Sequence, residues 1–288
     1  MGSLSQPPFT RIAIVGLGLI GGSVALAVKR RWPSIAIAAV DRPRVIATAL
    51  DTRIIDEGGE ELGIVGGADL VMLAAPVLQN VDALRRLPEH TSRALVTDTG
   101  STKRAILEAA ASLPAGLAFI GGHPLAGAAA GGVEAARPDL FDDRPWLLTP
   151  GPSASETAQQ TMSEFVRELR AVPQLIDAEQ HDRLLAYLSH LPQLTVSALM
   201  HVVGGHAGPN GLVLAGRGLR DTTRLASSPA SPWLDIVETN ADNIGDAIDA
   251  LIAALQELRA APPTPESGQR LEQMFVSAAR WKGLLEHS

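Results

Sequence analysis

Short apolar runs alternate with helical patterns over the first half of the chain. Six runs have the length and composition of buried strands, and they cover residues 11–15, 35–40, 70–74, 94–97, 117–120 and 146–148. The segments between them place apolar residues three or four positions apart, as on one face of a helix. This alternation predicts βαβ units that build an α/β fold with a doubly wound parallel sheet.

The second half changes to long Ala- and Leu-rich helical patterns after the turn signal at residues 150–152. We expect helices over residues 181–203, 233–260 and 267–286. The first must be kinked or divided at Pro192, because the proline ring displaces a turn and removes a donor. We therefore expect an α/β domain over residues 1–152 and an all-helical domain over residues 153–288. The apolar faces of that helical domain predict a homodimer.

An uncharged stretch over residues 12–28 has the hydropathy of a short membrane span. Glycines interrupt it, and it lies at the lower limit of spanning length. A strand, a tight turn and a buried helix explain the same residues better. We expect no membrane association.

Composition narrows the classes of function. The 288 residues contain no Cys, which excludes disulfides and zinc-thiolate sites and favours a cytoplasmic protein. The net charge of −7 and the 3% aromatic content argue against a nucleic-acid partner. A small anionic substrate would therefore need a local cluster of Arg side chains.

A glycine motif follows the first strand and opens a helical pattern. Gly16, Gly18 and Gly21 have the GxGxxG spacing that brings a backbone close to a pyrophosphate at a helix N-terminus. This context predicts a Rossmann-type NAD(P)-binding domain. Asp41 ends the second strand, where a carboxylate binds a ribose and repels the 2′-phosphate of NADP, so NAD is favoured. Arg42 and Arg44 could accommodate that 2′-phosphate, so NADP is an alternative cofactor. A second alternative is a glycine turn that binds no cofactor.

Further polar residues lie where other strands end. Asp98, Ser101 and Lys103 follow the strand at 94–97, at the carboxyl edge where doubly wound sheets bind ligands. Asp98 or Ser101 could equally be an ordinary helix cap. Lys103 is one of three lysines in the chain, which hints at a specific role. The expected cofactor-binding set is Gly16, Gly18, Leu19, Ile20, Gly21, Asp41, Arg42, Ala75, Pro76 and Asp98.

His123 follows the strand at 117–120 and is flanked by Gly122 and Pro124. We interpret it as a histidine on a constrained loop rather than in the core. With a pKa near neutrality it could accept the proton of a substrate hydroxyl while a hydride leaves the same carbon. No second His or carboxylate has ligand spacing, so no metal site is expected.

Two polar groups occur in the helical half. At 100° per residue, Tyr187, His190, Gln193 and Ser197 share one helix face, with His181 roughly opposite His190. These are candidate substrate contacts, or else hydrogen bonds within a core. If residues 217–224 are helical, one helix face contains Arg217, Arg220 or Asp221, and Arg224. Exposed salt bridges are the simpler explanation for Arg217 and Arg220. Asp221 and Arg224 are the better candidates for binding an anion.

Taken together, these motifs resemble the prephenate and arogenate dehydrogenase family, also called cyclohexadienyl dehydrogenases, of tyrosine biosynthesis. The resemblance covers residues 10–260. Its motifs are residues 16–23, 98–103, 122–124 with Gly127, 140–141, 148–150, 181–182, 189–192 and 220–226. It implies NAD(P)-dependent oxidative decarboxylation of a cyclohexadienol. His123 would take the ring hydroxyl proton, Ser101 would assist, and Arg224 would bind a substrate carboxylate.

Two positions depart from many prephenate-using members, namely Ala129 in place of a Glu and Gln193 in place of a second His. We expect prephenate as the substrate, with arogenate or dual specificity as the alternative. A β-hydroxyacid dehydrogenase and a nicotinamide-sensing protein without turnover are weaker alternatives. Little chain follows residue 260, so feedback by tyrosine through a C-terminal regulatory domain is not expected.

Overall fold

The protein is described by a computed structural model over residues 6–128, 130–260 and 265–286. The chain forms two compact units, one up to Ala241 and one from Asp242 onward. The first unit contains the sheet, the helices that cover it and a helical segment that follows. Ala129, at which the chain departs from the family pattern, lies outside the described residues.

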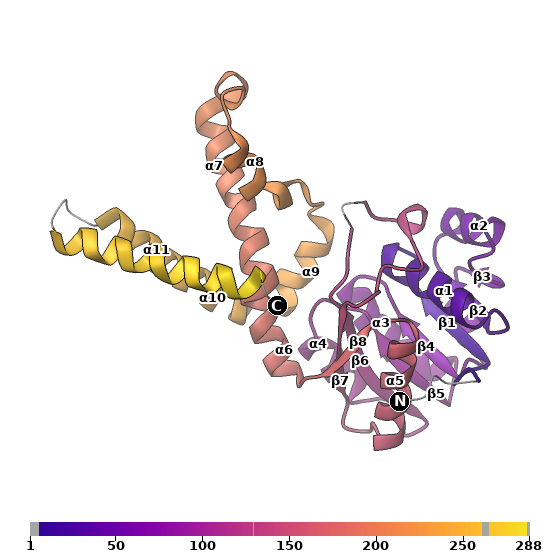
Figure 1. Cartoon of the computed structure of the whole chain (residues 1–288). Helices are drawn as coiled ribbons and strands as arrows, with labels where there is room; N and C mark the ends of the chain where they lie inside the picture. Colours follow the sequence, from indigo (N-terminus) through magenta and orange to yellow (C-terminus); the bar gives the residue numbers. More distant parts are fainter. Residues whose placement is uncertain (1–5, 129, 261–264, 287–288) are drawn as a thin grey trace. The chain divides into compact units, whose positions relative to one another are not determined.

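The sheet has eight strands in the order β3-β2-β1-β4-β5-β6-β7-β8 (Figure 1). The strands are β1 (Arg11–Val15), β2 (Ala36–Val40), β3 (Glu57–Gly59), β4 (Leu70–Leu73), β5 (Ala94–Asp98), β6 (Leu117–Pro124), β7 (Pro145–Pro150) and β8 (Val172–Leu175). Neighbours are parallel except β6 and β7, which are antiparallel. The strand order reverses next to β1, at the point where doubly wound sheets bind ligands. The predicted α/β fold is confirmed.

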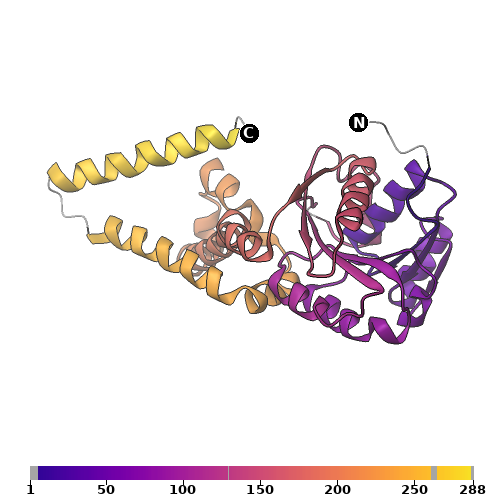
Figure 2. The ribbon, with the colours of Figure 1, turned by 90° about the horizontal axis from the view of Figure 1, so that it is seen from below.

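Helices cover both faces of the sheet, as Figure 2 shows. On one face, α1 (Leu19–Arg31), α2 (Pro43–Asp51) and α5 (Glu156–Glu168) contribute to one buried apolar cluster. On the other face, α3 (Val77–Arg86) and α4 (Arg104–Ala110) contribute to a second cluster. The uncharged stretch at residues 12–28 forms β1, the glycine turn and α1, as expected. In the part of the chain that the structure describes, no helix is long and apolar enough to span a bilayer.

Two strands were not expected from the sequence. β3 has no apolar pattern, and β8 is a largely exposed edge strand. Residues 153–175, which the sequence analysis assigns to the helical domain, form α5 and β8, and β8 pairs with β7. The boundary after residue 152 stays a prediction, but the sheet layer continues to Leu175.

The helical segment begins with α6 (Ala178–Leu185) and α7 (Leu191–Leu212), which are separated by a π-helical turn at Ala186–His190. The predicted break at Pro192 is therefore confirmed, and Pro192 is the second residue of α7. The segment at residues 217–227 is not one helix, because α8 (Arg217–Thr222) ends before a 3-10 turn at Arg224–Ser227. The shared face expected for Arg217 and Arg224 depended on one helix over this segment, and the structure does not have that helix.

The helix expected over residues 233–260 is two helices, because the backbone leaves helical geometry at Asn240. These are α9 (Ser231–Thr239) and α10 (Ala241–Ala260), and α11 (Pro265–Glu286) follows. In the single chain, α10 and α11 expose many large apolar side chains, including Leu255, Leu258, Leu271, Phe275, Val276, Trp281, Leu284 and Leu285.

Phe165 of α5 provides a test of whether α5 belongs to the sheet layer. Its ring is fully buried, lies edge-on to Phe9 at 5.4 Å and stacks on Trp32 at 6.0 Å. We expect Phe165→Ala to lower the free energy of unfolding by about 3–5 kcal/mol, measured by chemical denaturation. Arg167→Ala, an exposed position on the same helix, is the control and should change it by less than about 0.5 kcal/mol. Equal stability of the two variants would contradict this placement.

Candidate active site

The glycine turn after β1 combines tight protein packing with an open space. Gly16 has a φ of +97°, and a Cβ there would lie 2.7 Å from the Ala75 nitrogen. A Cβ on Gly21 would lie 2.0 Å from the Gly16 oxygen, whereas one on Gly18 would meet nothing within 4 Å. α1 starts beside that space with no side-chain cap and no acidic residue in its first turn. Its first N–H groups can therefore bind a phosphate.

The neighbouring strand ends are held in place by side chains. Asp41 accepts hydrogen bonds from the Leu17 N–H and the Arg42 N–H, both at 2.7 Å. The Arg42 side chain is mostly exposed. After β4, Asn80 accepts from the Ala75 N–H and donates to the Leu73 oxygen, which fixes the loop that contains Pro76.

A hollow of about 510 Å³ lies beside these strand ends, lined by residues that include Val15, Val40, Glu60, Leu62, Ala75 and Leu78. The hollow and the open position at Gly18 provide space for a dinucleotide, and the first N–H groups of α1 provide donors for its phosphates. The residues present fit that cofactor.

A buried ion pair joins the carboxyl ends of β5 and β6. Lys103 is fully buried and donates from Nζ to Asp98 and, at 2.7 Å, to the Gly122 oxygen. Asp98 is also buried, and it accepts from the N–H groups of Gly100 and Gly122 at 2.7 and 3.0 Å. Burial lowers the pKa of Lys103, and the adjacent carboxylate opposes that shift. The Asp98 carboxylate therefore holds the two strands in register.

His123 lies in β6 rather than on a loop, which corrects the expectation from its Gly and Pro neighbours. Residues 120–124 pair with the antiparallel strand β7, and His123 is opposite Leu147. Burial lowers the pKa of His123 well below its ordinary value, and His181, Lys103 and His190 lower it further. The imidazole is consequently neutral at pH 7 and can act as a base.

His181 and Asp182 of α6 continue from His123 into the interior. His123 Nδ1 lies 2.9 Å from His181 Nε2, and His181 Nδ1 lies 2.8 Å from Asp182 Oδ1. Burial opposes ionisation of Asp182, but the His181 ring and the N–H groups of Arg104 and Lys103 lower its pKa. Burial lowers the pKa of His181. This His-Asp pair is one of the motifs of the family resemblance, and no role for it follows from the sequence.

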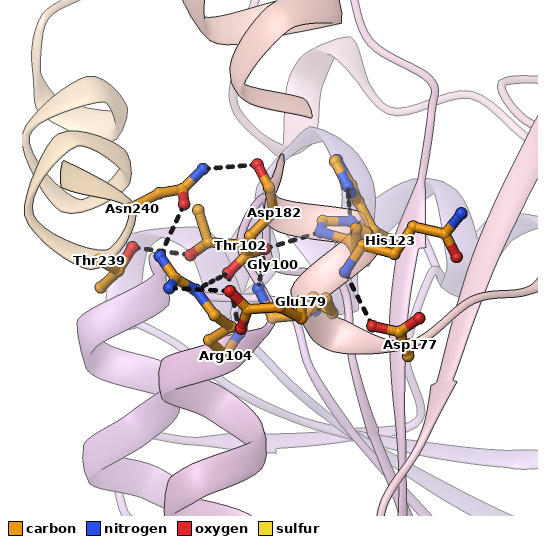
Figure 3. Close-up of polar contacts among 12 residues, drawn as sticks. Gly100, Thr102, Arg104, His123, Asp177, Glu179, Asp182, Thr239 and Asn240 are labelled. Carbon is orange, nitrogen blue, oxygen red and sulfur yellow. Dashed lines mark hydrogen bonds and ion pairs between the residues drawn. The ribbon is translucent and has the colours of Figure 1, made fainter. Parts of the chain in front are cut away.

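Asn240 links the helical segment to the same group of residues (Figure 3). Its Nδ2 donates to the backbone carbonyl oxygen of Asp182 at 2.8 Å and contacts His190 Nδ1 at 3.3 Å, and its Oδ1 accepts from Arg104 at 3.0 Å. Burial lowers the pKa of His190 to about 4, so this ring is neutral at pH 7. Since Nδ1 accepts from Asn240, the ring proton of His190 lies on Nε2.

The helical wheel placed His181 opposite His190, and this expectation is wrong. Both rings lie close enough to His123 to lower its pKa. The intervening π turn at Ala186–His190 rotates the chain by less per residue than an α-helix does. Asn240 and Arg104 were missed because no local pattern marks a residue whose partners are distant in the sequence.

The remaining predicted site residues are more dispersed. Gln193 is buried and donates to the Leu225 oxygen at 2.8 Å, and its Oε1 accepts from Ser228 at 3.2 Å. It therefore attaches the 3-10 turn to α7. Asp221 and Arg224 are exposed, and Ser101 lies in the partly exposed loop between β5 and α4.

A cavity of about 500 Å³ lies next to His123. Its walls are mainly apolar, and its lining is His123, Pro124, Leu125, Ala126, Leu147, Gln174, Ile176, Leu184, Leu185, Leu188 and Ser189. The cavity can hold a small ring, with the imidazole on one side. Over the described residues, no group of three or more His, Asp or Glu side chains could hold a metal ion.

Family models match most of the chain. The model described as "Prephenate dehydrogenase, nucleotide-binding domain" matches residues 24–175, and the model described as "Prephenate dehydrogenase, dimerization domain" matches residues 177–274. The first match begins after the glycine turn and ends with β8.

Known proteins of similar sequence and structure carry related names. The prephenate dehydrogenase of Bacillus subtilis is 35% identical over 257 residues, which are 86% of this chain and 69% of the relative. The crystal structure of prephenate dehydrogenase from A. aeolicus in complex with hydroxyphenyl propionate and NAD+ is 28% identical and has a TM-score of 0.83, with 97% of this chain and 99% of that chain covered. The Synechocystis arogenate dehydrogenase structure is 28% identical with a TM-score of 0.78, covering 94% and 99%.

Lys103→Met should be strongly destabilising, because it leaves the Asp98 carboxylate buried and unpaired. We expect a loss of about 3–5 kcal/mol in the free energy of unfolding, measured by chemical denaturation. Lys282→Met removes an exposed ion pair with Glu286 and should change it by less than about 1 kcal/mol. If the two lysine variants were equally stable, the buried pair would not hold the strand ends together.

Proposed function

The chain belongs to the prephenate dehydrogenase family, and from that premise we propose that it catalyses the oxidative decarboxylation of prephenate to 4-hydroxyphenylpyruvate in tyrosine biosynthesis. The observation that carries the proposal is the position of the half-buried His123 in the wall of a cavity of ring size. It lies at the carboxyl edge of a doubly wound sheet. Its strand β6 is separated by β4 and β5 from β1, which the glycine turn follows. A nearby nucleotide and a base are the two requirements of this oxidation.

His123 accepts the proton of the ring hydroxyl as the hydride leaves the same carbon. The carbon becomes a ketone, and loss of the ring carboxylate as carbon dioxide returns an electron pair to the ring. The resulting phenolate oxygen takes the proton back from His123, which leaves an aromatic phenol. In this proposal Ser101, in the loop after β5, assists His123 at the hydroxyl.

The cofactor assigned to the glycine turn is NAD, with NADP as the alternative. When bound, its nicotinamide accepts the hydride. Gly16, Gly18, Leu19, Ile20 and Gly21 would hold the pyrophosphate, and Ala75, Pro76 and Asp98 line or support the adjacent strand ends. Asp41 would bind the adenosine ribose and disfavour a 2′-phosphate, whereas the exposed Arg42 could accommodate one.

Arg224 and Asp221 are assigned to the substrate carboxylates, with Asp221 orienting Arg224. His190 would donate a hydrogen bond from Nε2 to the substrate. Gln193 would position the 3-10 turn that contains Arg224. Arogenate is the second candidate substrate, because Gln193 replaces the second His of many prephenate-using members and an arogenate dehydrogenase is among the similar structures.

The assembly we propose is a homodimer formed through the exposed apolar side chains of α10 and α11. The name of the family model that matches residues 177–274 supports this proposal. The same match favours a domain boundary near residue 176 over one after residue 152. A cytoplasmic location is part of the proposal and rests on the absence of Cys.

Initial rates of nicotinamide reduction test the function. We expect turnover with prephenate and NAD, slower rates with NADP, and a drop of about 10²–10⁴ in kcat for His123→Asn with nearly unchanged NAD binding. Because the pKa of His123 is lowered, the acid limb of kcat/KM should lie below pH 6.5. Turnover with arogenate alone would move the claim to the second substrate. No turnover with either, or a fully active His123→Asn, would overturn the proposal.

Arg224→Ala should mainly raise KM for prephenate, by about tenfold or more, because it removes a charged hydrogen-bond donor from a carboxylate. Arg217→Ala, an exposed arginine of α8, is the matched control and should leave KM unchanged. Steady-state kinetics at fixed saturating NAD measures both. An unaltered KM in the Arg224 variant would mean that another cation holds the carboxylate.

A further inference from the structure

A neutral imidazole has one ring proton, and only its unprotonated nitrogen can act as a base. His123 contacts His181 through Nδ1, so the nitrogen available to a substrate is Nε2. Whether Nε2 carries the proton decides whether His123 can work as a base at all. If His123 is the base of the proposed function, the contacts of its Nδ1 decide where the ring proton lies.

Asp182 is the last residue in the series of contacts His123–His181–Asp182, and its carboxylate can only accept hydrogen bonds. Asp182 is fully buried, and it receives hydrogen bonds from the N–H groups of Lys103 at 2.7 Å and Arg104 at 3.0 Å, and from the Arg104 guanidinium at 3.3 Å. The first two donors are the N–H groups at the start of α4. The N-cap residue of this helix, Lys103, makes no side-chain capping hydrogen bond. Burial opposes its ionisation, but the hydrogen bonds from His181 and from the Arg104 and Lys103 N–H groups lower the pKa of Asp182, so this carboxylate stays ionised.

Because Asp182 has no proton to donate, His181 must donate from Nδ1 across the 2.8 Å contact. A neutral His181 then has a bare Nε2, which can only accept. The 2.9 Å contact to His123 must consequently be an N–H donated by His123 Nδ1. The single ring proton of His123 is thereby placed on Nδ1, and its Nε2 is left bare.

This assignment of donors and acceptors requires a neutral His181, since a protonated His181 would donate to His123 and reverse the hydrogen bond between the two rings. Burial and Lys103 lower the pKa of His181, while Asp182 and Asp98 oppose that shift, and the net shift is downward. His123 faces His181, Lys103 and His190, which all disfavour a positive charge there. Both rings are neutral at pH 7.

We propose that His181 and Asp182 are positioning residues that fix the tautomer of His123, holding its proton on Nδ1 and keeping Nε2 free to accept the substrate's proton. Neither touches the substrate in this assignment. When His123 becomes charged during turnover, its Nδ1–H keeps the same acceptor, and the Asp182 carboxylate two groups away offsets the new charge.

Side-chain ¹⁵N NMR of the full chain, without cofactor or substrate at pH 7, reads the tautomer directly. We expect the wild-type His123 to show a protonated Nδ1 and a bare Nε2. A His123 resonance with the proton on Nε2 would overturn the proposal, whatever the enzyme does in an activity assay. If the expected tautomer is found in a protein that turns over neither substrate, the proposed function fails, whereas the assignment of His181 and Asp182 as the residues that fix the tautomer is retained.

Variants at His181 connect the tautomer to the rate. His181→Leu removes the acceptor, so the Nε2-protonated form of His123 should become populated and kcat should fall about 10–100-fold, with KM and NAD affinity little changed. His181→Gln keeps an acceptor oxygen and should restore the wild-type tautomer and much of kcat. His201→Leu, an exposed histidine of α7, is the control and should change neither. Wild-type tautomer and kcat in His181→Leu would overturn the proposal.

Discussion

The structure around the candidate active site depends on one buried carboxylate. Helix α4 begins without a side-chain cap from its own sequence, and its first N–H groups are satisfied by Asp182, which lies 79 residues from Lys103 along the chain. The same carboxylate accepts from His181 and from Arg104. The packing of the helical segment against the sheet layer and the geometry of the candidate site therefore depend on the same carboxylate. A substitution there would affect stability and chemistry together.

Local patterns in the sequence were sufficient for much of the fold. The glycine turn, the strands β1, β2, β4, β5, β6 and β7 and the break at Pro192 follow from short-range periodicity, from turn chemistry and from the geometry of proline. β3 and β8 carried no comparable signal, because an edge strand needs little apolar surface and is held mainly by its neighbour's backbone. The placement of α5 on the sheet depends on Phe165 packing against Phe9 and Trp32, which no local pattern encodes.

The candidate site was predicted in part. His123 was found from its flanking Gly and Pro residues, although the antiparallel pairing with β7 makes it part of a strand. The convergence of His181 and His190 was missed, because a helical wheel assumes a constant rotation and the π turn interrupts it. Asn240 joins Arg104, Asp182 and His190 from a break between two helices, and only the folded chain brings these partners together.

The glycines after β1 serve two different ends within one motif. A side chain on Gly21 would collide with the backbone of Gly16, so that position is constrained by folding itself. Gly18 has ordinary backbone angles and open space where a side chain would point, so that position is constrained only by what must fit into the space. Natural selection for a folded protein alone would preserve Gly21 and let Gly18 drift. A lineage that kept the fold but gave up nucleotide binding would be recognised by loss of the middle glycine first.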